Sequence, residues 1–109
     1  MLVIDHTRNN GSAEVVAGDS FRLQLGENPT TGYRWHMQND GAPALRTVED
    51  SFEVSPGAVG GGGIRYWIFA AEQPGTAALS IELRRSWQPQ QPASTFSIAI
   101  SVKPKPDSR

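Results

Sequence analysis

The chain has 109 residues, no cysteine and a formal net charge of −1. This length is typical of one domain, with a core large enough to need neither a disulfide nor a metal. The lack of cysteine excludes thiol nucleophiles and thiolate metal sites, and the balanced charge gives no attraction for nucleic acid. Since no segment reaches the roughly 20 apolar residues of a membrane span, we expect neither nucleic acid nor a membrane as a partner.

The N-terminal residues, MLVIDHTRNN, lack the long apolar run of a leader peptide. A leader that was removed and replaced by a start methionine would leave the same sequence. The compartment therefore stays open: periplasmic or secreted if a leader was removed, and otherwise cytoplasmic.

The first half of the chain has the pattern of short β-strands. Residues 2–6 and 14–17 suit strands at the edges of a sheet. Apolar and polar side chains alternate over 21–25 and again over 33–38, as in strands with one buried face. Residues 45–54 fit either one bent strand or two short ones.

The second half continues in the same way. Residues 64–71, IRYWIFAA, are apolar on both faces, which is typical of a strand in the middle of a sheet. Leu79 and Leu83 have a helical spacing, but Ile81 joins their face under alternation, so the segment GTAALSIELRR is interpreted as a strand. Alternation is clearest over 95–103.

Short strands separated by turns, with 11 glycines, 8 prolines and no convincing helix, predict an all-β fold. We expect an immunoglobulin-like antiparallel β-sandwich of about seven to eight strands, with a closed barrel as the alternative. Residues 1–103 are expected to form a single domain, and the polar, proline-broken residues 104–109 a flexible C-terminal tail.

Consecutive antiparallel strands reverse direction, so every second connection lies at the same end of a sandwich. This count places the loops 26–32, 55–63 and 85–94 at one end. The other end receives GD, NDGAPA and EQPG, which look like ordinary connectors. Long loops gathered at one end of a rigid sandwich are typical of binding proteins.

The first of these loops, NPTTGY, is longer than a plain hairpin requires. Pro29 fixes one backbone angle and Gly32 permits a positive one, so the loop can project stiffly with Thr30 and Thr31 at its tip. A decorated turn without a binding role is the structural alternative.

The other two loops also suit binding. Gly60–Gly63 have no side chains, so a partner's backbone could approach them closely, although a flexible linker would look the same. Arg85 and Trp87 flank Ser86, and arginine and tryptophan are enriched at binding hot spots. The alternative for Trp87 is a side chain folded back on the edge of the sandwich.

The ordered set NPTTGY (28–33), GGGG (60–63) and RSW (85–87) resembles the chagasin family of inhibitors of papain-like cysteine proteases. The resemblance extends from about residue 12 to 103, and NPTTG followed by an aromatic residue is its most specific part. The third loop of that family usually reads Arg-Pro-Trp, so Ser86 departs from the pattern.

The resemblance implies a monomeric, immunoglobulin-like inhibitor without a cofactor, which blocks the protease cleft reversibly and non-covalently with loops 28–33, 57–63 and 85–91. It implies that Thr31 lies nearest the catalytic cysteine and histidine, with the glycine loop along the unprimed side and the third loop on the opposite rim. The residues expected to bind the protease are Asn28, Pro29, Thr30, Thr31, Gly32, Tyr33, Gly60, Gly61, Gly62, Gly63, Arg85, Ser86 and Trp87.

Other classes of function have less support in the sequence. The only histidines are His6 and His36, and nothing indicates a Ser-His-Asp arrangement or a metal site, so we expect no enzyme. A carbohydrate-binding or adhesion module is the alternative, since an exposed tryptophan can stack on a sugar ring. Trp35 and Trp67 are expected to pack inside, which leaves Trp87 as the one candidate platform.

Overall fold

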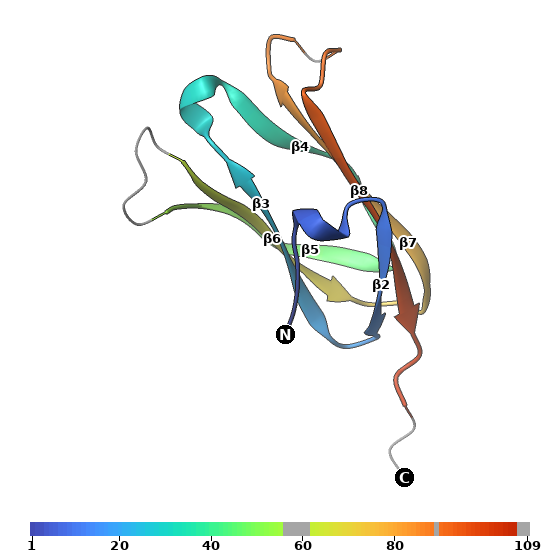
Figure 1. Cartoon of the computed structure of the whole chain (residues 1–109). Coiled ribbons are helices and arrows are strands. Elements are labelled where there is room, and N and C mark those ends of the chain that lie inside the picture. Colours follow the sequence, from blue (N-terminus) through green and yellow to red (C-terminus); the bar gives the residue numbers. More distant parts are fainter. Residues whose placement is uncertain (56–61, 89, 107–109) are drawn as a thin grey trace.

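Alternating apolar side chains build eight strands in two sheets in the computed structural model, which describes residues 1–55, 62–88 and 90–106. The first sheet has the strand order β1 (Leu2–Ile4), β3 (Ser20–Glu27), β6 (Gly63–Ala71) and β5 (Leu45–Val54). The second sheet has the order β2 (Gly11–Val16), β8 (Ser94–Lys103), β7 (Gly75–Arg85) and β4 (Tyr33–Asp40). The sheets pack face to face, so the predicted all-β, immunoglobulin-like sandwich is confirmed (Figure 1).

The two N-terminal strands lie at sheet edges, as predicted, but they pair in parallel. β1 runs parallel to β3, and β2 runs parallel to β8. The chain passes from one sheet to the other through a single 3-10 turn, η1 (His6–Arg8), which the side chain of Asp5 caps by accepting a hydrogen bond from the Thr7 backbone. Parallel strands are not joined by a hairpin turn, which is the feature that reveals an antiparallel pair in a sequence. The sequence therefore did not indicate which strands β1 and β2 pair with.

The remaining strands are antiparallel, and their bounds agree with the sequence pattern to within a few residues. The segment 45–54 is one strand, β5, whose register shifts between Thr47 and Glu49. The ambiguous segment 75–85 is the strand β7, and β6 lies between β3 and β5 inside its sheet. Within the described residues the only helices are η1 and η2 (Pro29–Thr31), and neither is long and apolar enough to cross a membrane.

The core lies between the sheets and is formed by side chains of the inward-facing strand positions. Phe21 stacks on Phe69 with ring centroids 5.4 Å apart. The buried apolar residues are Ile4, Val15, Phe21, Leu23, Leu25, Leu45, Trp67, Phe69, Ala71, Ala77, Leu79, Ile81, Phe96, Ile98, Ile100 and Val102.

Strand pairing brings the ends of the three long loops together. In the first sheet, Gly63 lies between Val54 on one side and Glu27 on the other. In the second sheet, Tyr33 pairs with Arg85. The loop 28–32 crosses from the middle of one sheet to the edge of the other, so it lies between the stems of the other two loops (Figure 1).

Candidate functional site

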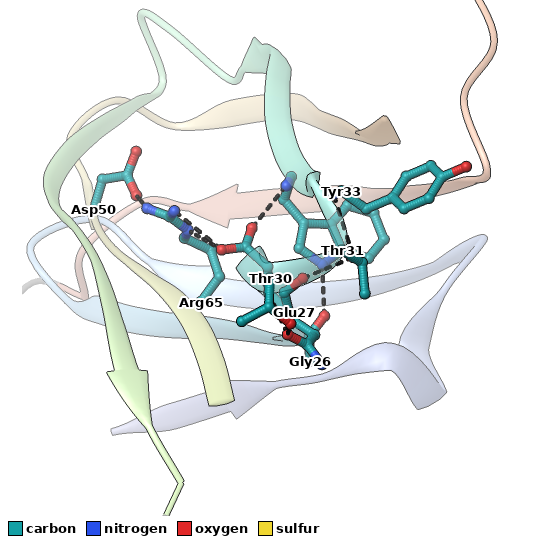
Figure 2. Close-up of polar contacts among 9 residues, drawn as sticks. Gly26, Glu27, Thr30, Thr31, Tyr33, Asp50 and Arg65 are labelled. Carbon is teal, nitrogen blue, oxygen red and sulfur yellow. Dashed lines mark hydrogen bonds and ion pairs between the residues drawn. The ribbon is translucent and has the colours of Figure 1, made fainter. Parts of the chain in front are cut away.

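The loop 28–32 folds into one 3-10 turn that its own side chains hold. Oδ1 of Asn28 accepts hydrogen bonds from the Thr30 backbone N–H at 3.1 Å and from the Thr30 hydroxyl at 2.6 Å. The hydroxyl of Thr31 donates to the Asn28 carbonyl at 2.8 Å and accepts from the Tyr33 N–H at 3.3 Å. Pro29 at the start of the turn has no N–H to satisfy. The tip is therefore fixed before any partner arrives, with Thr30 and Thr31 exposed to solvent (Figure 2).

Gly32 ends this turn and contacts the third loop. Its φ of +83° is a left-handed conformation that favours glycine. A Cβ atom at this position would lie 2.6 Å from Cη2 of Trp87, so the indole would have to move for any other residue type. The indole of Trp87 thus packs over the backbone of Gly32 while its side chain stays 67% exposed. Trp87 is therefore folded against the first loop with most of its surface exposed.

The third loop begins with a tight turn from Arg85 to Gln88. The Gln88 N–H donates to the Arg85 carbonyl at 3.0 Å, which places Ser86 second in the turn, where proline is also favoured. The guanidinium of Arg85 lies 4.4 Å from the ring centroid of Tyr33 and 5.7 Å from that of Trp87. Cation–π contacts of this kind link the first and third loops.

Below the first loop, a buried carboxylate joins the two sheets. The Glu27 side chain is 0% exposed, and its Oε2 accepts a hydrogen bond from the backbone N–H of Trp35 at 2.8 Å. Nε1 of the same residue donates to the carbonyl of Gly26 at 2.8 Å. Both bonds run from Trp35 on β4 to neighbouring residues of β3, one from its backbone and one from its side chain, so they hold the two stems of the loop together (Figure 2).

The same carboxylate connects to the stem of the second loop. Oε1 of Glu27 accepts hydrogen bonds from Nη2 and Nε of Arg65, at 3.1 and 3.3 Å, and Nη1 of Arg65 donates to Asp50 at 3.1 Å. Burial alone would lower the pKa of Arg65, but its hydrogen bonds and charge attraction, first to Glu27 and then to Asp50, raise it above its ordinary value. Arg65 therefore stays charged, and the Glu27 carboxylate has a permanent counter-ion.

The described part of the second loop consists of its two ends. The Ser55 N–H donates to the Gly62 carbonyl at 3.2 Å, which continues the β5–β6 hairpin beyond the strands. A Cβ atom on Gly63 would collide with the Glu53 carbonyl, so glycine is required there by its own neighbouring strand. Gly60 and Gly61 lie outside the described residues, as does the rest of 57–61.

The structure thus brings together the predicted residues that it describes. Those of the first and third loops are in direct contact, and Gly62 and Gly63 adjoin them through Glu27 and Arg65. Sequence reasoning missed Glu27 and Arg65. The sequence pattern did indicate that they are unusual. In the alternation of β3 and β6, each occupies an inward-facing position, where an apolar residue is expected. Among the described residues, no group of acidic side chains and histidines could hold a metal ion.

A sandwich that presents adjacent, internally braced loops at one end is built as a binding protein. Residues 14–102 match the model of the chagasin family peptidase inhibitor I42, and the chain belongs to this family of inhibitors, which are not enzymes. It is 31% identical to Amoebiasin-1 of Entamoeba histolytica, over 94% of this chain and all of that protein, and 25% identical to Chagasin of Trypanosoma cruzi, over 91% and 96%. Its fold matches the crystal structure of a cysteine protease inhibitor from Entamoeba histolytica with a TM-score of 0.84 and 20% identity, over 94% and 95% of the two chains.

The substitution Gly32→Ala tests the contact between the first and third loops. We expect a loss of about 1 to 2 kcal/mol in the free energy of unfolding because of the positive φ, and a displaced Trp87. Urea unfolding measures the first effect, and the shift of the Trp87 indole N–H signal in NMR spectra measures the second. Gly26→Ala is the control, since a Cβ atom there meets nothing within 4 Å. Equal behaviour of the two variants would contradict the contact.

The substitution Glu27→Ala tests the clamp below the loops. It leaves Arg65 and the Trp35 N–H without their buried acceptor, so we expect unfolding to become easier by about 2 to 4 kcal/mol. Asp50→Asn removes the charge of the other partner of Arg65. Since the Asp50 side chain is 54% exposed, this substitution should lower the free energy of unfolding by less than about 1 kcal/mol. Chemical denaturation compares the two, and a cost for Glu27→Ala no greater than that for Asp50→Asn would refute the clamp.

Proposed function

We propose that the chain is a reversible, non-covalent inhibitor of papain-like cysteine proteases, and that it fills their active-site cleft with loops 28–33, 57–63 and 85–91. Membership of a peptidase-inhibitor family supports the class of function. The motifs NPTTGY, GGGG and RSW, which resemble those of inhibitors of papain-like enzymes, support the class of target.

The bracing of the first loop is the observation that carries this proposal. Asn28 and Thr31 fix the backbone turn, and Gly32 seats the loop against Trp87. A loop held in this way resists the extended conformation that a protease cleaves, and it loses little conformational entropy on binding, where each immobilised side chain otherwise costs roughly 0.5 to 1.5 kcal/mol. A wedge with Thr31 at its tip would enter the cleft without becoming a substrate.

The flanking loops would supply the remaining contact area. Arg85 and Trp87 are held beside the tip by Tyr33 and Gly32, so they can reach one rim of a cleft while the glycine loop lies along the other side. Together the three loops would form an interface of standard size, on the order of 1,600 Å² in total. No covalent step is required.

Titration into papain and into cathepsin L, with a fluorogenic peptide as substrate, tests the proposal. We expect inhibition that is reversed by dilution, with the inhibitor chain recovered uncut as judged by mass spectrometry. Trypsin, a serine protease, is the control and should keep its activity. A lack of inhibition at micromolar concentration with both papain-class enzymes would refute the proposal and favour the carbohydrate-binding alternative.

Trp87→Ala measures the contribution of the third loop. If Trp87 is a hot spot, we expect binding to weaken by about 1 to 4 kcal/mol, which is a rise in the inhibition constant of about 5-fold to 1,000-fold. Val48→Ala is the matched control, because Val48 is also an exposed apolar side chain, 52% exposed on β5. An inhibition constant that is the same for both variants would remove Trp87 from the binding surface.

A further inference from the structure

Apart from Arg85, the first residue of the third loop, the three loops carry no charge, so the electrostatic character of this end comes mainly from the strands that bear them. Residues 28–33, 55–63 and 86–94 contain no aspartate, glutamate, lysine, arginine or histidine. The charged side chains nearest to the loops belong to those ends of β3 to β7 that adjoin the loops. All of these charged side chains belong to residues that the structure describes.

Beside the third loop, arginines are concentrated. Arg34 on β4 lies directly opposite Arg84 on β7, and the neighbouring pair contains Arg85. Two like charges opposite each other destabilise a sheet. One carboxylate lies near them: Oε1 of Glu82 is 3.4 Å from Nε of Arg84. Three arginines with one glutamate leave two positive charges in excess here.

These arginines have unused binding capacity. Among the residues that the structure describes, no carboxylate forms an ion pair with Arg34 or Arg85. The Nε atoms of Arg84 and Arg85 are not part of this capacity, since both are buried and that of Arg84 faces Glu82. Arg34 itself is exposed on the outer face of the second sheet. The repulsion between the opposed Arg34 and Arg84 costs stability in the free protein, and an anionic partner would offset it.

Beside the second loop, the balance is reversed. Arg22 is paired with Glu53 at 3.8 Å, and Arg65 is paired with both Glu27 and Asp50 at 3.1 Å. Three carboxylates with two arginines leave one negative charge in excess. The side chains of Asp50 and Glu53 are 54% and 60% exposed. The loop end thus has a positive side at β4 and β7 and a negative side at β5.

We propose that Arg34 and Arg84 form a cationic docking surface, which binds an acidic patch of the partner protease on the rim beside the third loop. This inference rests on the proposed function and specifies the kind of protease that it selects. The opposite charges at β4–β7 and β5 orient the inhibitor during the encounter, so that the uncharged tips of the loops meet the cleft in the correct direction. Charges at the rim of an interface act mainly on the association rate constant.

The matched substitutions Arg34→Glu and Arg46→Glu test this surface. Both replace an exposed arginine and change the net charge equally, but Arg46 lies at the far end of β5, opposite Ala70, and is paired with Glu72 at 3.3 Å. Association and dissociation rate constants are measured by stopped flow with papain, cathepsin L and falcipain-2, at about 20 mM and about 300 mM NaCl, since added salt screens exposed charges.

For at least one of these proteases we expect Arg34→Glu to lower the association rate constant by about 3-fold to 10-fold at low salt and much less at high salt. The dissociation rate constant should change little, and Arg46→Glu should behave as the unsubstituted chain. Equal association rates for both variants with every protease that is inhibited would overturn this inference alone. Absence of inhibition by the unsubstituted chain would overturn the proposed function as well.

Discussion

The buried carboxylate of Glu27 holds the loop-bearing end of this sandwich together. Toward that end the apolar core stops, because the next inward-facing positions after Leu25 on β3 and Trp67 on β6 are Glu27 and Arg65. An unpaired charge at such a place would be costly. Here Arg65 neutralises it, and the second oxygen accepts the backbone N–H of Trp35 from the other sheet. Beyond the apolar core, the hydrogen bond from Trp35 to Glu27 therefore holds the two sheets together at the first loop.

This clamp explains how loops from different sheets can act as one body. The first loop is fixed at both stems by bonds between β3 and β4. The stem of the second loop is reached through Arg65, and the third loop is held by Arg85 on Tyr33 and by Trp87 on Gly32. Each contact joins the first loop to a neighbour, which makes it the centre of the assembly. Its internal hydrogen bonds therefore fix the geometry of the whole loop end.

Much of this fold could be predicted from the sequence, because a period of two is a strong signal wherever one face of a strand is buried. It identified β3, β4 and β8, and the same parity resolved β7 as a strand although Leu79 and Leu83 also suit a helix. The parallel pairing of β1 with β3 was not predictable, since β1 has three residues and carries too little pattern to choose a partner. Pairing of this kind depends on the tertiary structure.

For the candidate site, the loops were visible as motifs, but the interactions that connect them were not. Glu27 and Arg65 are 38 positions apart, and only the register of β3 with β6 makes them neighbours. Two opposite charges at inward-facing positions of two strands were nevertheless a readable sign that those strands lie side by side. The contact of Trp87 with Gly32 had no such sign, because glycine was already explained by its backbone angle.

The cost of desolvation explains why the loop tips are neutral and the charged side chains lie on the strands below them. A charged tip would lose its hydration inside a narrow cleft, and this loss can exceed the attraction that it gains. Neutral, hydroxyl-bearing and glycine-rich tips avoid the cost, whereas arginines on the strands below remain near solvent and still act over a Debye length of about 8 Å at physiological salt. Arg34 and Arg84, opposite each other on neighbouring strands, are tolerable in this position because β4 is an edge strand and the Arg34 side chain can extend away into solvent. The edge of the sheet therefore permits a concentration of positive charge that its centre would not.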